Sequence, residues 1–411
     1  MTTGARSAAR EAADPRPALP RAFWWLWTAT LVNRLGGFVV VFLSLYVTLE
    51  RGYSASFAGL VATLYGAGGA VGAVGGGMLA DRLGRRVTLL GAQLLSAVTT
   101  GALAFAQGRV ALAVTACLAG LAGNASRPVV QAVVTEVVAA KARVRAFSLI
   151  YWAVNIGVAV SAALAGMLAQ HGYLPLFLGE AAVTALCALV VYLTVPETRP
   201  GPAPRGSADP PAQTPHVPRR RRFLAFVAVT FLVGLLMQEV STALPLTMAG
   251  AGHTARDYGL VISLNGLLVV ALQLPAGRVL ARYRPAGPLV VGALLLGGGL
   301  GLTAVAGSLA AYALTVVIWT VGEIVLAPTS MATVAELVPD HSQGRHQGLY
   351  SFAWAAAACV APAVSGFALD TMGPAALWGA SATLGVLAAV GYFLILYGTA
   401  GADGRHDRRA N

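Results

Sequence analysis

The chain has 411 residues, of which 57% are hydrophobic and only 11% are charged. Soluble domains carry about 25% charged residues, so this composition excludes a soluble globular protein and indicates a polytopic membrane protein. The net charge of +12 does not predict nucleic-acid binding, because the basic residues lie between apolar stretches and form no basic face.

Twelve apolar stretches follow one another along the chain, each near the ~20 residues that a membrane-spanning helix needs. We predict a cytoplasmic tail at 1–21, a six-helix bundle at 22–195, a Pro- and Gly-rich linker at 196–222, a second six-helix bundle at 223–397 and a cytoplasmic tail at 398–411. The expected helices span 22–49, 54–80, 87–107, 109–138, 146–169, 174–195, 223–250, 254–280, 287–307, 309–338, 346–369 and 374–397.

The distribution of Lys and Arg predicts the orientation of these helices. Of the 28 such residues, 23 lie in the tails and the loops on one side of the predicted membrane, and two lie within helices. The other three, Arg51, Arg109 and Arg256, lie in loops on the opposite side. Because cytoplasmic loops carry the excess of positive charge, we expect a multi-pass protein of the cell membrane with both termini in the cytoplasm.

The first stretch contains a charge at membrane depth. Arg34 follows Asn33 and precedes Gly36 and Gly37, where a loosened helix has a place to pivot. An ionisable group at this depth costs at least ~2.5–3.5 kcal/mol, so it needs a partner, a watery cavity or a function. Arg34 is therefore predicted to bind an anionic or polar substrate, or to hold a carboxylate in its charged form.

The second stretch ends abruptly at residues 77–86. A glycine here lets two helices approach closely, and Asp81 can cap a following helix or face the positive end of another. The arginines are expected to lie against anionic lipid headgroups. An ordinary stop-transfer flank would require only the arginines, so the spacing predicts a specialised loop. Its fixed positions are Gly77, Asp81, Arg82, Gly84, Arg85 and Arg86.

Further charges lie in the fourth and sixth stretches. Arg127 has Asn124 and Gln131 about one turn away and is followed by Pro128, which kinks a helix. We expect Arg127 to form either a gating ion pair or a contact with substrate. Glu180 lies toward the outer end of a peripheral helix, so we expect it to reach headgroup water.

Two carboxylates lie in the second set of helices. Glu239 stands beside Gln238, and Glu323 lies about 14 residues into its helix, near mid-depth, with no other polar side chain nearby. A carboxyl group in apolar surroundings gains and loses its proton nearer to neutral pH than one in water. Both are candidates for carrying a proton. The alternatives are a structural salt bridge from Glu323 to Arg127 or Arg34, and a vestibule carboxylate with no coupling role at 239.

The two sets of helices repeat each other with an offset of 200 residues. Repeated glycine, proline and arginine positions are not what chance similarity between apolar segments produces, so the repeat predicts two pseudo-symmetric bundles. The loop signature is degraded in the second copy, where Ala281 stands in place of Asp81. The repeated positions include Gly59 and Gly259, Gly66 and Gly266, Gly77 and Gly277, Pro128 and Pro328, Arg145 and Arg345, and Gly166 and Gly366.

The segment G-x-L-A-D-R-x-G-R-R at 77–86 resembles the loop between helices 2 and 3 of major facilitator superfamily transporters. The region 126–149 is similar to helices 4–5 of one multidrug-exporter subgroup, so the chain looks most like the twelve-helix drug:proton antiporters. It departs from them at 161–166, which lacks their helix 5 signature, and at Ala116, where they carry an arginine. The resemblance implies that Asp81 meets the start of helix 11 and locks the outward-facing state, with Arg145 a candidate partner.

The same resemblance implies that helices 1, 4, 7 and 10 line a central substrate cavity. Arg34, Arg127, Glu239 and Glu323 then lie one on each of these helices. The leading hypothesis is a monomeric secondary transporter that exports a small amphiphilic compound in exchange for protons. Proton-coupled uptake of a sugar, peptide or metabolite is the alternative, and a non-transporting receptor or scaffold is a third possibility.

The sequence contains no pattern typical of an enzyme. It has no nucleophile–base pair, no metal-ligand cluster and no phosphate-binding loop, so we expect no catalytic residue, metal or cofactor and no use of ATP.

Overall fold

The computed structural model describes residues 19–138, 142–194, 217–280, 282–337 and 343–397, and every regular element in those ranges is a helix. Eleven of these helices are long and apolar enough to cross a membrane, which confirms the predicted all-α polytopic membrane protein. They are α4 (Ala55–Leu83), α5 (Arg85–Phe105), α6 (Arg109–Val137), α7 (Arg143–Leu168), α8 (Leu174–Thr194), α9 (Val217–Gly250), α10 (Ala255–Leu280), α11 (Ala286–Gly301), α12 (Leu309–Leu337), α13 (Gln343–Thr371) and α14 (Gly373–Tyr397). The span of α11 is completed by the short helix η4 (Leu302–Val305) that continues it.

The first expected helix is present in three pieces, here called helix 1 together. They are α2 (Arg21–Leu35), α3 (Val39–Leu45) and the π-helix η1 (Tyr46–Glu50), and their combined length equals one further crossing. Gly36 and Gly37 lie between α2 and α3, so the helix is interrupted where the sequence predicted it to loosen. The other bounds agree with prediction within a few residues, except that α9 begins at Val217 inside the expected linker. Most of both predicted tails and of the linker lies outside the described residues.

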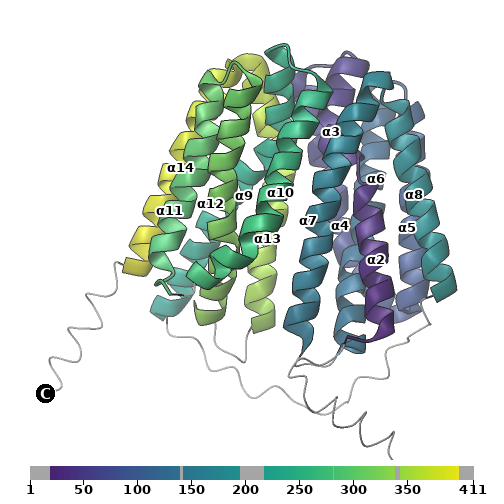
Figure 1. Ribbon diagram of the computed structural model, residues 1–411, viewed down its shortest axis with the longest axis horizontal. Helices are drawn as coiled ribbons and strands as arrows, with labels where there is room; N and C mark the ends of the chain where they lie inside the picture. The colour runs from purple at the N-terminus through teal and green to yellow at the C-terminus, as the bar shows by residue number, and fades with distance from the viewer. Residues whose placement is uncertain (1–18, 139–141, 195–216, 281, 338–342, 398–411) are drawn as a thin grey trace, which may run out of the picture.

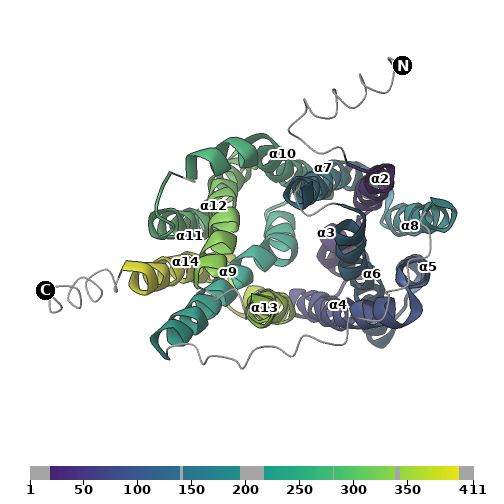
Figure 2. The same ribbon diagram turned by 90° about the horizontal axis from the view of Figure 1, so that it is seen from below.

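The helices form two groups, α2–α8 (the first group) and α9–α14 (the second group), which stand side by side (Figure 1). We call the face where α2 begins and α14 ends the lower face, and the opposite one the upper face. From below, α7 lies beside α10 and α4 beside α13, while α5, α8, α11 and α14 lie at the outer edges (Figure 2). Parts of helix 1, α6, α9 and α12 therefore lie between these outer helices and the junction of the two groups.

Glycines bring the two groups into contact along α4–α13 and α7–α10. A Cβ atom at these positions would overlap the facing backbone, so only glycine permits such close approach. The contacts are Gly59 with Gly366, Gly66 with Ala358, Gly259 with Gly166, and Gly266 with Ala159. These glycines are members of the predicted repeat, so the repeat marks the surfaces where the groups meet.

All of these contacts lie in the upper half of the molecule. Further down α4, Gly72 and Gly76 pack instead against Leu121 and Ala125 of α6, within the first group. In the upper half, Phe42 of helix 1 also packs edge-on against Tyr258 of α10, with 5.6 Å between ring centroids. The described glycine and ring contacts between the groups therefore hold them together toward the upper face.

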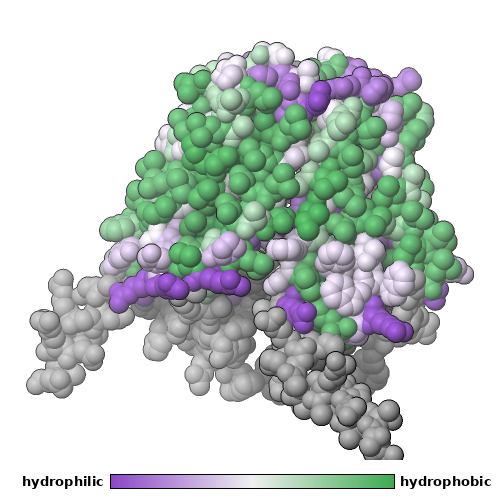
Figure 3. All heavy atoms as spheres, in the orientation of Figure 1, coloured by the Kyte–Doolittle hydropathy of each residue, from purple (hydrophilic) through white to green (hydrophobic). Residues whose placement is uncertain are grey.

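The outer surface has an apolar belt between two polar edges (Figure 3). Large apolar side chains point outward along the middle of the outer helices, including Val98 of α5, which is 67% exposed, and Leu387 of α14, which is 53% exposed. Side chains of this kind are stable at a surface only where lipid replaces water. The chain is therefore a multi-pass membrane protein.

Candidate functional site

The break in helix 1 positions the first candidate residues. At the end of α2, Gly36 N–H bonds to Val32 O and Gly37 N–H bonds to Arg34 O, both at 3.2 Å. Asn33 and Arg34 thus lie in the last turn of α2 and are half-buried near the middle of helix 1. A cation there also lies at the negative end of its own helix dipole, where cations are preferred.

Two arginines of the first group lie close enough to influence each other. Arg34 has Arg127 of α6, Tyr65 of α4 and Glu180 of α8 as electrostatic neighbours. Arg127 is exposed, and within the described ranges neither arginine forms an ion pair with a carboxylate. Two cations with one carboxylate nearby leave a positive region, which favours an anionic or polar group from elsewhere.

The remaining polar candidates on these helices are less closely associated. Asn124 donates to Gly120 O at 3.1 Å, and its side chain packs against Gly69, so it supports the contact of α4 with α6. Gln238 is half-buried on α9, and the side chain of Gln131 lies outside the described residues. Of the described members of this predicted set, the structure brings together the two arginines.

Glu323 occupies the midpoint of the 29-residue helix α12. The side-chain amide of Asn265, on α10, donates to Glu323 Oε2 at 2.9 Å and approaches Thr320 Oγ1 at 3.0 Å. Tyr151 of α7, which belongs to the first group, is an electrostatic neighbour of this carboxylate. Glu323 therefore lies near the other group while all its described hydrogen-bond partners are neutral.

Glu239 lies within the second group, between α9 and α14. Its side chain is 5% exposed and accepts a hydrogen bond of 2.7 Å from the hydroxyl of Ser381. The same hydroxyl also approaches Leu377 O at 3.0 Å. The carboxylate therefore points toward a peripheral helix, and the structure does not bring it together with Glu323 or with the two arginines.

The expectation for Glu180 is wrong. Its Oε2 atom accepts a hydrogen bond of 2.6 Å from the backbone N–H of Val39, the first residue of α3. The hydroxyl of Ser161, on α7, donates to Gly37 O at 3.1 Å. These side chains satisfy backbone groups that the interruption of helix 1 leaves unpaired, which in an apolar environment would each cost several kcal/mol. Glu180 is thus directed into the first group and not toward headgroup water.

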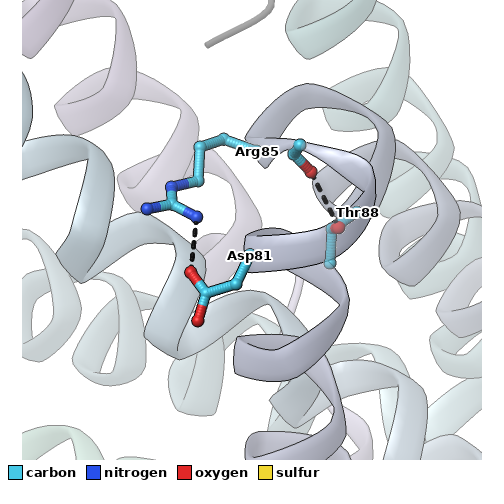
Figure 4. Close-up of polar contacts among 4 residues, drawn as sticks. Asp81, Arg85 and Thr88 are labelled. Carbon is cyan, nitrogen blue, oxygen red and sulfur yellow. Dashed lines mark hydrogen bonds and ion pairs between the residues drawn. The ribbon is translucent and has the colours of Figure 1, made fainter. Parts of the chain in front are cut away.

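The predicted loop joins α4 to α5 at the lower face. Gly84 separates the helices with φ +100°, a conformation that favours glycine. Asp81 Oδ1 accepts a charged hydrogen bond of 2.8 Å from Arg85 Nη1, and Thr88 Oγ1 donates to Gly84 O at 2.8 Å (Figure 4). Asp81 is exposed, so the ion pair lies where water screens it and contributes little stability.

The arginines of this loop do not all face lipid headgroups. Arg85 is buried and bonded to Asp81, so for this residue the headgroup expectation is wrong. Arg86 is half-buried and stacks over the exposed ring of Tyr192 at 5.0 Å. Arg82 is exposed, as expected. Arg145 is also exposed, and in the described part of the chain Asp81 pairs with Arg85 and not with Arg145.

Gly77 has room around it, since a Cβ there would come no closer than 4.0 Å to a neighbour, at Pro128. Nothing in the present contacts of α4 therefore requires glycine at this position. A glycine with no present contact remains available for close approach in a different arrangement of the helices.

Asn265 is the functional candidate that we did not predict. The signal in the sequence is that an amide in the apolar run 264–269 must find a polar partner. The carboxylate 58 positions later is that partner. Within the described residues no group of three or more His, Cys, Asp or Glu side chains is arranged to hold a metal ion.

Comparisons with known proteins agree with this arrangement. The family model described as Major Facilitator Superfamily matches residues 26–362 and 226–409. The chain is 24% identical over 363 residues to the uncharacterized MFS-type transporter YqjV of Bacillus subtilis, covering 85% of this chain and 87% of that protein. It is 26% identical over 336 residues to the multidrug resistance protein MdtH of Aeromonas hydrophila, covering 79% and 82%.

Solved structures show the same fold. A POT family transporter in complex with 5-aminolevulinic acid superposes with a TM-score of 0.76 at 16% identity, covering 92% of this chain and 96% of that one. The relatives and structural neighbours of this chain are membrane transporters, so the chain is a transporter and not an enzyme. With two helix groups related by an internal repeat, and with a family model that matches most of its length, the chain belongs to the Major Facilitator Superfamily.

Proposed function

We propose that this transporter exports small amphiphilic compounds in exchange for protons across the cell membrane, by alternating access. The similarity to MdtH multidrug resistance proteins supports export of such compounds. The observation that carries the proton coupling is Glu323, which lies at mid-depth near the junction of the two groups with a neutral amide as its partner.

We infer that the lower face is cytoplasmic and that the structure represents the inward-facing state. The asymmetry of Lys and Arg in the loops supports this orientation. The glycine contacts that join the groups near the upper face support closure on the outer side. In this state Asp81 bonds to Arg85 of its own group. In the outward-facing state Asp81 meets the start of α13 instead.

A carboxylate serves proton exchange when its charged form is not held permanently by a fixed cation. Glu323 meets this condition in the inward-facing state, since its described hydrogen-bond partner, Asn265, is neutral. When the two groups rock, Arg127 or Arg34 approaches Glu323 and favours release of its proton. Substrate contacts the same region, with Asn33 and Gln238 at its edge. We propose that Glu239 does not exchange protons but supports the second group.

We further propose that the protein acts as a monomer, and that anionic lipid headgroups bind at the exposed Arg82 and at Arg221 near the start of α9. Both are exposed at the lower face, where such headgroups attract cations. No nucleic acid is involved.

Inside-out membrane vesicles test the direction and the coupling together. Vesicles with the wild-type protein are given a proton gradient with an acidic lumen. The lipophilic dye Hoechst 33342 is then added outside, and the dye in the lumen is followed by fluorescence. We expect accumulation that an uncoupler abolishes and that the Glu323→Gln variant lacks at equal expression. The Glu50→Gln variant, changed at an exposed residue of η1, is the matched control and should accumulate dye normally.

Two other results would contradict the proposal. Dye accumulation that an uncoupler leaves unchanged would show that export is not driven by the proton gradient. Gradient-driven loading of a sugar, peptide or metabolite into right-side-out vesicles, without dye export in any orientation, would replace export by uptake.

A further inference from the structure

A carboxylate of the second group caps a helix of the first group at the upper face. Asp370 is the penultimate residue of α13 and accepts hydrogen bonds from Ala55 N–H at 3.2 Å and Ser56 N–H at 2.6 Å. These are the first two free N–H groups of α4, and the third, on Phe57, bonds to the Ser54 hydroxyl at 3.3 Å. The start of α4 is therefore fully capped only while the two groups are together.

The position of Asp370 is unfavourable for its own helix. A carboxylate in the last turn of a helix lies at the negative end of the helix dipole, where cations are preferred. At the start of α4 the same carboxylate meets a positive helix end and two donors. Asp370 is thus stabilised by a contact that exists only while the groups are closed at the upper face.

The contact continues downward as an uninterrupted seam between α4 and α13. The backbone N–H of Ala363 bonds to Thr63 Oγ1 at 3.1 Å, and the glycine contacts Gly59–Gly366 and Gly66–Ala358 lie on either side of that bond. The cap therefore closes the upper end of a packed interface that is otherwise largely apolar.

The lower end of the same helix pair carries the second such residue. Asp81 lies in the last turn of α4, next to the level at which α13 begins, because the two helices run antiparallel. Its side chain is 72% exposed and bonds to Arg85 of its own group. Each helix of the pair thus has an aspartate near its end that can cap the start of the other.

We propose that Asp370 is the upper counterpart of Asp81, and that each aspartate locks one of the two states by capping the start of the opposite helix. Asp370 caps α4 when the upper face is closed, and Asp81 caps α13 when the lower face is closed. This inference rests on the alternating access proposed above. It adds Asp370, which lies outside the loop signature at 77–86.

Distances between spin labels test the lock without requiring a substrate. Labels are placed at Val110→Cys and Val305→Cys for the upper face, and at Val87→Cys and Tyr283→Cys for the lower face, in protein that lacks Cys117, Cys187 and Cys359. All four labelled positions are exposed. Double electron–electron resonance in nanodiscs then gives the populations of the open and closed arrangements at each face.

The Asp370→Ala variant should raise the ratio of upper-open to upper-closed molecules by between about twofold and thirtyfold, the range for loss of a helix cap, and Asp370→Asn, which retains one acceptor oxygen, should raise it less. Asp81→Asn should shift the populations in the opposite direction. Asp257→Asn is the matched control and should change neither pair, because Asp257 caps its own helix by accepting from Thr254 N–H at 2.8 Å.

Two outcomes would overturn the lock, and they are distinguishable. In the first outcome, the wild-type protein shows both the open and the closed label distance at the upper face as pH is varied, but Asp370→Asn and Asp370→Ala leave the ratio of open to closed molecules unchanged. Alternating access then stands and the lock is wrong. If every variant and the wild-type protein show a single upper-face distance at all pH values, alternating access fails and the lock fails with it.

Discussion

The two helix groups place a polar contact at the same position and use it differently. In the first group Glu180 of α8 accepts from the Val39 N–H of helix 1, and in the second group Ser381 of α14 donates to Glu239 of α9. Glu180 and Ser381 each follow by eight residues a positive-φ glycine near the start of their helix, and Val39 and Glu239 are 200 residues apart. Equivalent positions are therefore in contact in both groups. The carboxylate lies on the peripheral helix α8 in the first group and on α9 in the second.

A second pair of positions shows the same difference. Asn265 reaches Glu323 in the second group, whereas Tyr65, 200 residues earlier, has its hydroxyl beside Gly123. The first group thus has a glycine where the second has a carboxylate. Glu180, a carboxylate of the first group, accepts from the backbone of helix 1 and has Arg34 as an electrostatic neighbour. A carboxylate held in this way is suited to structure, so the comparison supports the proposal that proton exchange belongs to the second group.

The largest effect that this comparison predicts is at Glu323. Glutamine resembles the protonated carboxyl group and cannot release a proton, so Glu323→Gln should lose proton-driven accumulation. Downhill exchange of substrate should stay within about twofold of wild type, because it does not require the proton. Substrate-induced proton release from purified protein in detergent measures this directly. Persistent release from Glu323→Gln would transfer the role to another residue and break the assignment.

The next effect concerns the carboxylate of the first group. Glu180→Ala should lower the free energy of unfolding by about 1.5–3 kcal/mol, since a hydrogen bond to a charged acceptor is lost and the Val39 N–H is left unpaired. Glu180→Gln retains an acceptor and should lose about half as much. Thermal unfolding in detergent compares both with Glu50→Gln, changed at an exposed site of helix 1. Equal stability of all three variants would show that Glu180 does not support the break.

The interruption of helix 1 was predictable because paired glycines follow a charge, whereas the role of Glu180 was not. From the sequence alone, an acidic residue near a helix end is expected to reach water. What decides its direction is that α8 packs closely on the break, where a Cβ on Gly36 would come within 2.7 Å of Val183. The repeated glycines predicted the two pseudo-symmetric bundles. They could not reveal which partner each glycine meets, because an internal repeat fixes equivalent positions and not their contacts.

A smaller effect is expected at Arg127, an exposed cation on α6. Arg127→Ala should slow exchange by about fivefold to tenfold, because the carboxylate that it approaches in the other state loses its partner. Arg127→Lys keeps the charge and should retain part of the rate. Counterflow of dye in proteoliposomes measures both, with Arg256→Ala as a control at an exposed upper-face site. Equal rates for the alanine and lysine variants would exclude a role for the charge.

The smallest effect is expected at Ser381, and it tests the comparison most directly. Removing its hydroxyl takes away the 2.7 Å hydrogen bond to Glu239, a side chain that is 5% exposed. A buried carboxyl group without this donor can remain neutral by keeping its proton, so the loss is limited to about 1 kcal/mol of stability. Proton-driven accumulation should stay within about twofold of wild type if Glu239 does not exchange protons.

The matched control lies on the same helix. Thr383 is exposed, and its hydroxyl donates to Gly379 O within α14 at 3.0 Å, so Thr383→Ala removes a hydroxyl without touching a carboxylate. Thermal unfolding should separate Ser381→Ala from this control, while dye accumulation should not. If Ser381→Ala instead lost accumulation as fully as Glu323→Gln, Glu239 would have to exchange the proton. The contact between Ser381 and Glu239 would then serve transport and not only stability, because a carboxylate that faces a peripheral helix would couple proton movement to transport as effectively as one at the junction of the groups.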